Sequence, residues 1–186
     1  MPVRSRKRWR TFAERARRVR LLLMDVDGVL TDGHIYLQSL PDGTAEEMKA
    51  FHAHDGAGLK LARMAGLRTG VITGRDSPAT TRRAREVGME FVSQKQAEKL
   101  PAYEEILRQA RVGDEEVAYI GDDLPDLPVL DRVGLAIAVG NAAPEVKRVV
   151  HLVTRRSGGD GAVREAIEAI LRAQGCWHKL IGKARA

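Results

Sequence analysis

The chain has 186 residues, of which 44% are hydrophobic and 30% charged, enough for one domain with its own hydrophobic core. Its single cysteine, Cys176, excludes an internal disulfide. No apolar run approaches the ~20 residues needed to span a bilayer, and residues 1–20 lack the apolar core of a signal peptide. We therefore expect a cytoplasmic protein without a membrane partner.

The net charge of +6 is concentrated at the N-terminus. Residues 1–20 hold nine of the 31 basic and one of the 25 acidic residues, a net +8, which leaves 22 basic against 24 acidic residues, a net −2, for the rest of the chain. Trp9 is the only aromatic residue among the clustered bases of residues 4–10, whereas single-strand binding uses several stacking rings. We interpret residues 1–20 as a basic arm, with a helix over Thr11 to Val19, and do not expect a nucleic-acid partner.

After the arm the sequence alternates between strand and helix patterns. The apolar run from Leu21 to Met24 predicts a buried first strand. Ile35 to Gln38 and Glu47 to Phe51 alternate in polarity around the turn Pro41-Asp42-Gly43, which predicts a hairpin at about 34–52. Helices are expected over 56–65, 77–87, 97–110, 127–133, 144–148 and 162–173, and strands over 68–73, 90–93, 117–120, 135–139 and 151–153.

Strands separated by helices pair in parallel, with right-handed crossovers that place helices on both faces of the sheet. The fold class predicted is therefore α/β, a doubly wound and mostly parallel sheet with a projecting hairpin and no large cap domain. Residues 21–174 would form this domain, and residues 175–186 a C-terminal tail.

Polar residues follow four of the predicted strands where each strand ends. In a doubly wound sheet the ligand binds beyond the carboxyl ends of the strands, so we expect these residues to share one site. They are Asp25 and Asp27 after the first strand, Thr73-Gly74-Arg75 after the second, Lys99 at the helix after the third, and Gly121-Asp122-Asp123-Leu124-Pro125-Asp126 after the fourth.

These residue types match the requirements of phosphoryl transfer. Asp25 is the candidate nucleophile, which would form an aspartyl-phosphate, and Asp27 the candidate acid and base. The Thr73 hydroxyl would bind phosphoryl oxygens, while Lys99 would balance and orient Asp25. Mg²⁺ would be held by Asp25, the backbone carbonyl of Asp27 and Asp122. Asp123 and Asp126 would cap or support the loop.

The order and spacing of these motifs resemble the haloacid-dehalogenase superfamily, most closely its capless 3-deoxy-D-manno-octulosonate 8-phosphate phosphatases. The resemblance extends from about Leu21 to Gln174. It implies a Mg²⁺-dependent hydrolase of a sugar-acid phosphate in lipopolysaccharide biosynthesis, and a homotetramer whose hairpins form a central barrel. It rests on Asp25-Val26-Asp27-Gly28-Val29-Leu30-Thr31-Asp32, Lys49-Ala50-Phe51, Asp55-Gly56, Ile72-Thr73-Gly74-Arg75, Ala118-Tyr119-Ile120-Gly121-Asp122-Asp123-Leu124 and Gly161-Ala162-Val163-Arg164-Glu165.

The same resemblance implies a set of substrate contacts. Arginine is common in the family where His54 and Lys60 stand, and neither residue reproduces its bidentate fork; Asp160 stands where a basic residue is frequent. A nine-carbon keto-sugar-acid phosphate is therefore the alternative substrate. The implied contacts are Asp27, His52, His54, Asp55, Gly56, Lys60, Gly74, Arg75, Arg83 and Lys99.

Two other classes of function compete with a phosphatase. A receiver module also holds a phosphoryl group on an aspartate at a sheet edge, but its aspartate follows the third strand. A binding scaffold that recruits nucleic acid through the arm would not need the four motifs together. His52 and His54 alternate as metal ligands can, but no third ligand stands at a spacing typical of zinc.

A site without a cap domain is poorly shielded from water in a single subunit. The predicted hairpin carries apolar residues that could cover it by association, namely Ile35, Leu37, Met48 and Phe51. We therefore expect the chain to oligomerise through this hairpin.

Overall fold

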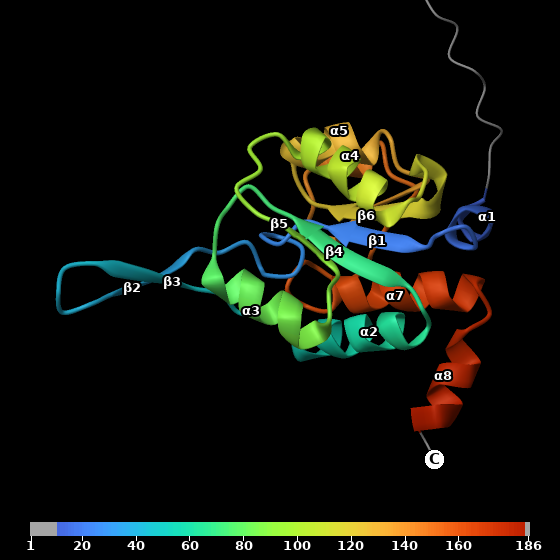
Figure 1. The fold of residues 1–186 in the computed structure, drawn as a ribbon, viewed down its shortest axis with the longest axis horizontal. Coiled ribbons are helices and arrows are strands. Elements are labelled where there is room, and N and C mark those ends of the chain that lie inside the picture. The colour runs from blue at the N-terminus through green and yellow to red at the C-terminus, as the bar shows by residue number, and fades with distance from the viewer. Residues whose placement is uncertain (1–10, 185–186) are drawn as a thin grey trace, which may run out of the picture.

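The computed structural model describes residues 11–184 and has three layers, with helices on both faces of a central sheet (Figure 1). Its six strands pair in parallel in the order β5-β4-β1-β6-β7-β8, which confirms the predicted doubly wound sheet. The strands are β1 (Leu21–Met24), β4 (Arg68–Ile72), β5 (Phe91–Ser93), β6 (Val117–Gly121), β7 (Leu135–Ala138) and β8 (Leu152–Val153).

Figure 1 shows α2, α3 and α7 on one face of the sheet, and α4 and α5 on the other. Val163, Ile167 and Ile170 of α7 are fully buried, because helical spacing brings them to the side that faces the sheet. The helices are α1 (Phe12–Ala16), α2 (Ala53–Met64), α3 (Pro78–Val87), α4 (Lys99–Ala110), α5 (Leu127–Leu130), α6 (Pro144–Lys147), α7 (Ala162–Ala173) and α8 (Trp177–Ala184), with short 3-10 turns η1 (Asp114–Glu116) and η2 (Leu124–Asp126). No described helix has the length and apolar character to cross a membrane.

The central strand β1 fixes the position of the first acidic pair. All four of its residues are buried, between β4 on one side and β6 on the other. Hydrogen bonding to β6 continues one residue past the strand, since the Asp25 N–H donates to the Ile120 carbonyl at 3.0 Å. Asp25 therefore has its backbone fixed by the sheet although it lies at the start of a loop.

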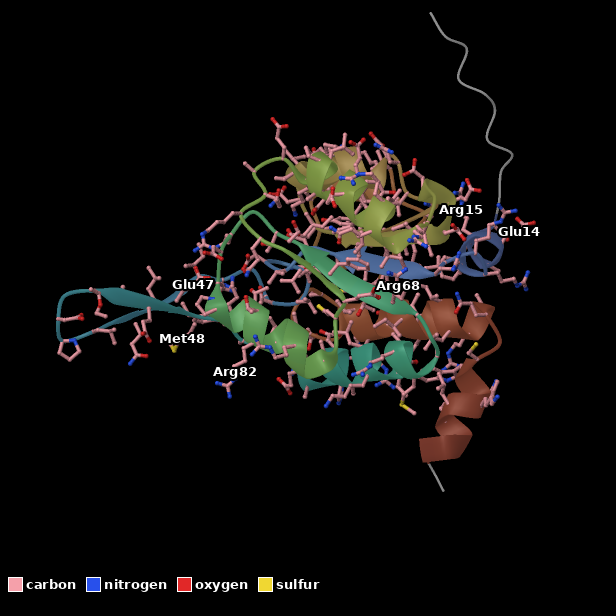
Figure 2. All side chains as sticks on the ribbon, in the orientation of Figure 1. Glu14, Arg15, Glu47, Met48, Arg68 and Arg82 are labelled. Carbon is pink, nitrogen blue, oxygen red and sulfur yellow. The ribbon has the colours of Figure 1, made fainter. Side chains whose placement is uncertain are left out.

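The predicted hairpin forms a separate antiparallel pair, β2 (Tyr36–Ser39) and β3 (Ala45–Met48), which projects beyond the carboxyl edge of the main sheet (Figure 1). Glu47 and Met48 lie on opposite sides of β3 (Figure 2). Ile35, Leu37 and Met48 are 58%, 65% and 49% exposed, which leaves an apolar surface uncovered. The second strand ends at Met48 rather than at the predicted Phe51, because residues 49–51 leave the ladder and return to the body.

Both ends of the described chain pack on the body. Helix α1 ends at Ala16, earlier than the predicted Val19, yet both residues are buried in the core. The other end continues as α8, where Trp177 is buried beneath the guanidinium groups of Arg164 and Arg172, at 5.4 and 4.8 Å from its ring. Packing with the body thus includes parts of the predicted arm and tail, whereas residues 1–10, with Trp9, lie outside the described residues.

Candidate active site

The loops after β1, β4 and β6 and the start of α4 surround one pocket of about 370 Å³. The structure thus brings together residues from all four predicted strand ends, which are separated by up to about a hundred positions in the sequence. The pocket is lined by Asp25, Asp27, Gly33, Gly74, Gln96, Ala97, Lys99, Asp122, Asp123 and Pro125. Thr73 is buried beside it, and its hydroxyl accepts the Arg75 N–H at 3.3 Å.

Lys99 and Asp126 form a buried ion pair at the bottom of this pocket. The Lys99 ammonium lies 2.7 Å from Asp25 Oδ2 and 2.7 Å from Asp126 Oδ1. Asp126 Oδ1 also accepts the Tyr119 hydroxyl at 2.7 Å, and its Oδ2 accepts the backbone N–H groups of Asp122 and Asp123 at 3.0 and 3.3 Å. Asp126 therefore connects the ammonium to the loop that carries Asp122.

Burial and mutual repulsion shift the pKa values of the acids in this pocket. Burial raises the pKa of Asp25 from 3.8 to about 6, although the Lys99 ammonium opposes this and Asp126 adds to it. Burial also raises the pKa of Asp122 to about 7, with further contributions from Asp126 and Asp25. For Lys99, burial lowers the pKa, but Asp25 and Asp126 reverse this and the net shift is upward. The pocket thus holds more carboxylate charge than its one ammonium neutralises.

This excess of carboxylate suits a divalent cation. One carboxylate oxygen from each of Asp25, Asp122 and Asp126 lies within 4.8 Å of the others. Both oxygens of Asp126 already accept hydrogen bonds, whereas Asp122 Oδ1 is buried without a hydrogen-bond partner among the described residues. Asp25 and Asp122 line the pocket, whereas Asp126 does not, so these two fit a hard cation such as Mg²⁺ best, because such ions prefer carboxylate oxygens.

Gly28 makes room for Asp122. Its φ is +85°, and a Cβ built on it would lie 2.1 Å from Asp122 Oδ2. A side chain at this position is therefore both strained and in collision with the candidate cation ligand.

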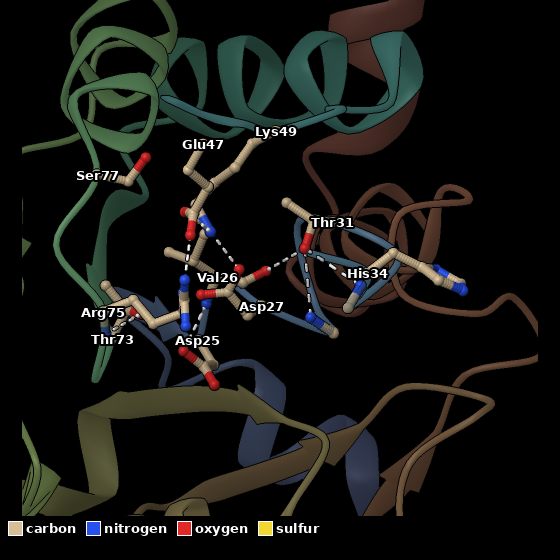
Figure 3. Close-up of polar contacts among 12 residues, drawn as sticks. Asp25, Val26, Asp27, Thr31, His34, Glu47, Lys49, Thr73, Arg75 and Ser77 are labelled. Carbon is tan, nitrogen blue, oxygen red and sulfur yellow. Dashed lines mark hydrogen bonds and ion pairs between the residues drawn. The ribbon is translucent and has the colours of Figure 1, made fainter. Parts of the chain in front are cut away.

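A second group of charges adjoins the pocket on the hairpin side (Figure 3). The Lys49 ammonium pairs with Asp27 Oδ1 and lies 3.0 Å from Glu47 Oε1, and Glu47 also pairs with Arg75. The sequence indicates Glu47 as a hairpin residue and Lys49 as part of the motif Lys49-Ala50-Phe51 in the family resemblance, but it predicts neither as a site residue. Alternation along an extended segment, which places residues two apart on the same side, was the signal that could have indicated a shared role.

Several residues of the implied substrate-contact set lie outside the 370 Å³ pocket of their own chain. Asp55 is buried and its Oδ1 accepts the Arg164 N–H at 2.7 Å, which joins the start of α2 to that of α7. The Arg83 guanidinium occupies the space beside Gly56, where a Cβ would meet it at 2.2 Å, and donates to the His52 carbonyl at 3.4 Å. Asp55 and Gly56 thus have packing roles within the chain.

His54 and Lys60 are exposed on α2. His54 lines a different pocket of about 510 Å³, whose walls come mainly from the loop before α7 and from α7 itself. Neither residue contributes to the acidic pocket within one chain, and His52, 3.8 Å from Asp160, does not line it either.

The parallel sheet with acids, a hydroxyl and a buried ammonium at its carboxyl edge defines the class of α/β proteins that carry out phosphoryl transfer. The profile of the haloacid dehalogenase-like hydrolases matches residues 72–167. The 3-deoxy-D-manno-octulosonate 8-phosphate phosphatase of Yersinia pestis is 44% identical over 161 residues, 87% of this chain and 84% of that protein. The chain belongs to the haloacid dehalogenase-like hydrolase family, among its 3-deoxy-D-manno-octulosonate 8-phosphate phosphatases.

Solved structures agree with this assignment. The crystal structure of a probable yrbi family phosphatase from Pseudomonas syringae has a TM-score of 0.89 and 42% identity, and the match covers 94% of this chain and 97% of that one. The 3-deoxy-D-manno-octulosonate 8-phosphate phosphatase of Moraxella catarrhalis, crystallised with magnesium ion, phosphate ion and KDO, has a TM-score of 0.87 and 38% identity, covering 92% of this chain and 97% of that one.

We expect Gly28→Ala to weaken Mg²⁺ binding at least about tenfold, because the new Cβ displaces the Asp122 carboxylate and each lost charged ligand contact costs more than about 1.4 kcal/mol. Isothermal titration with Mg²⁺ measures the loss. Gly43→Ala is the matched control, since Gly43 has a φ of +83° and a Cβ built on it would have nothing within 4 Å. It carries the same backbone strain, so equal Mg²⁺ affinities in the two variants would contradict the steric argument.

Mg²⁺ should stabilise the protein more at about pH 8 than at about pH 5. Asp25 and Asp122 have folded-state pKa values raised from 3.8 to about 6 and about 7, so between about pH 4 and 7 the folded state binds more protons than the unfolded state. Without a cation, stability is therefore lost as the pH rises through this window. Mg²⁺ replaces these protons and offsets the loss, by roughly 1–3 kcal/mol at saturating concentration.

Thermal unfolding with Mg²⁺ or with EDTA, at both pH values, measures this difference. The comparison at each pH cancels the contribution of titrating groups elsewhere in the chain. An equal rise of the melting temperature with Mg²⁺ at both pH values would show that Asp25 and Asp122 do not bind the ion.

Proposed function

We propose that this chain is a Mg²⁺-dependent phosphatase that hydrolyses 3-deoxy-D-manno-octulosonate 8-phosphate in the cytoplasm. The main support is the 44% identity, over 87% of this chain, to the 3-deoxy-D-manno-octulosonate 8-phosphate phosphatase of Yersinia pestis. The pocket in which Asp25, Asp27, Lys99 and Asp122 meet agrees with this activity. A phosphate ester with a carboxylate fits a site that has both a cation position and Arg75 at its margin.

In the proposed first step, an Asp25 carboxylate oxygen attacks phosphorus in line with the ester bond. The new bond joins Asp25 to phosphorus, the bond from phosphorus to the sugar oxygen breaks, and Asp27 gives its proton to that oxygen. In the second step, water attacks the aspartyl-phosphate, Asp27 accepts a proton from the water, and inorganic phosphate leaves with Asp25 regenerated.

The remaining residues of the pocket orient these two acids and bind the phosphoryl group. Lys99, held by Asp126, keeps Asp25 Oδ2 in place, and Thr73 with the Gly74 segment would bind phosphoryl oxygens. Mg²⁺, when bound by Asp25, Asp122 and the Asp27 carbonyl, supplies the charge that neutralises those oxygens. A receiver module is disfavoured because its phosphorylated aspartate would follow the third strand, whereas Asp25 follows the first.

The substrate's sugar portion would be bound with help from a second subunit. His54 and Lys60 are exposed and lie outside the pocket of their own chain, so we propose that they, with His52 and Arg83, act at a neighbouring copy. Association through the hairpins into a homotetramer would bring such residues to the open side of the pocket.

Sedimentation velocity at micromolar concentration should show a tetramer for the natural chain and smaller species for Leu37→Asp. The reason is that Leu37 is 65% exposed on the hairpin, and a charge there would be costly to bury in an interface. Val149→Asp is the control, as Val149 is 45% exposed outside the hairpin. A monomeric natural chain, or equal effects of both substitutions, would contradict assembly through the hairpin.

Asp25→Asn should lower turnover of the sugar phosphate by roughly 10³-fold or more, because an amide cannot form the covalent intermediate. Phosphate release from the sugar phosphate with Mg²⁺ measures the loss. Near-natural turnover in Asp25→Asn would exclude Asp25 as nucleophile.

A panel of eight-carbon and nine-carbon keto-sugar-acid phosphates, assayed with Mg²⁺ by phosphate release, tests which substrate the natural chain prefers. The highest kcat/KM is expected for 3-deoxy-D-manno-octulosonate 8-phosphate. A higher kcat/KM for a nine-carbon acid would establish the alternative substrate.

A further inference from the structure

The two oxygens of Asp27 have different surroundings. Oδ1 accepts the Lys49 ammonium, whereas Oδ2 is buried and has no hydrogen-bond partner among the described residues. Among the described residues, the Lys49 ammonium is thus the one hydrogen-bond partner of the Asp27 carboxyl group. Because an ammonium only donates hydrogen bonds, this contact fixes the orientation of the carboxyl group beside the pocket.

Lys49 is itself held in place. Its side chain is only 4% exposed, and its ammonium also lies 3.0 Å from Glu47 Oε1. Glu47 is held in turn by its ion pair with Arg75. The hydrogen bond from Arg75 lowers the pKa of the Glu47 carboxyl group most, and Lys49 lowers it further. The order Arg75, Glu47, Lys49, Asp27 alternates in sign, so each member is attracted by its neighbours (Figure 3).

We propose that Lys49 is a positioning residue for the acid and base Asp27, whose carboxyl group it holds at the edge of the pocket. The inference rests on the proposed function, because it assigns a role within the same reaction. During ester cleavage the O–H bond of the Asp27 carboxyl group breaks and a new O–H bond forms on the leaving sugar oxygen. During hydrolysis of the aspartyl-phosphate, the Asp27 carboxylate takes the proton from the attacking water.

A purely structural ion pair predicts a different pattern of losses. If Lys49 only held the hairpin to the body, its removal would impair every phosphate ester equally. A positioning role predicts a loss that depends on the leaving group, because an alkoxide needs protonation as the bond breaks while p-nitrophenolate leaves readily without it. Comparing esters with different leaving groups therefore distinguishes a structural role of Lys49 from a positioning role.

The test compares kcat/KM for 3-deoxy-D-manno-octulosonate 8-phosphate and for p-nitrophenyl phosphate, with Mg²⁺ present. This parameter reports only the steps up to aspartyl-phosphate formation, so the common second step does not enter. We expect Lys49→Met and Lys49→Ala to lose roughly 10- to 100-fold more activity on the sugar phosphate than on the aryl phosphate, a part of the 10²–10⁴-fold contribution of general acids. Lys49→Arg, which keeps a cation, should retain most of the natural ratio.

Lys179→Met serves as the control, since Lys179 is exposed on α8, far from the hairpin in Figure 1; neither rate constant should change. Thermal unfolding verifies the fold of each variant, and either of the two neutral variants suffices for the comparison. Equal losses on both esters in a folded variant would overturn the role of Lys49. A natural chain inactive on both esters would instead overturn the proposed function, so the two failures are distinguishable.

Discussion

The site depends on one buried carboxylate that has no free oxygen. Asp126 is 1% exposed, and it accepts hydrogen bonds from the Lys99 ammonium, the Tyr119 hydroxyl and two backbone N–H groups. In a region of low dielectric such a group is stable only when it is fully satisfied. The β6 loop is shaped to satisfy it, since a Cβ on Gly121 would lie 2.6 Å from Asp126 Oδ2. Asp126 thereby fixes both the ammonium that reaches Asp25 and the backbone that carries Asp122.

The charges around the pocket fall into two groups, one around Asp25 and one around Asp27. Asp25 belongs to the group inside the sheet edge, where acids outnumber the single ammonium of Lys99 and the pKa of Asp25 is raised to about 6. Asp27, two residues further, belongs to the hairpin group, where Lys49 and Arg75 balance it and Glu47. Two neighbouring carboxyl groups thus have separate electrostatic environments, the arrangement by which enzymes give paired acids different tasks.

The sequence was sufficient for the sheet and for the residues that end its strands, because strand and helix periodicity and the rule for carboxyl edges depend only on local pattern. It was not sufficient for Lys49, which meets Asp27 only because the hairpin returns toward the sheet at one particular angle. Nor could local pattern show that Asp126, one of three acids in its loop, would be the buried one. That distinction comes from Tyr119 and Lys99, whose polar ends point to the same spot in the folded chain.

The hairpin combines two features that a two-stranded element cannot support alone, because an isolated hairpin is marginally stable in water. Its base is fixed by the pairs from Glu47 to Arg75 and from Lys49 to Asp27, while Ile35 and Leu37 leave its outer part apolar and exposed. If neighbouring copies cover that outer part, they restrain the strand that places Lys49. Assembly and proton transfer would then share one element, since a displacement of β3 moves an apolar contact at one end and the partner of Asp27 at the other.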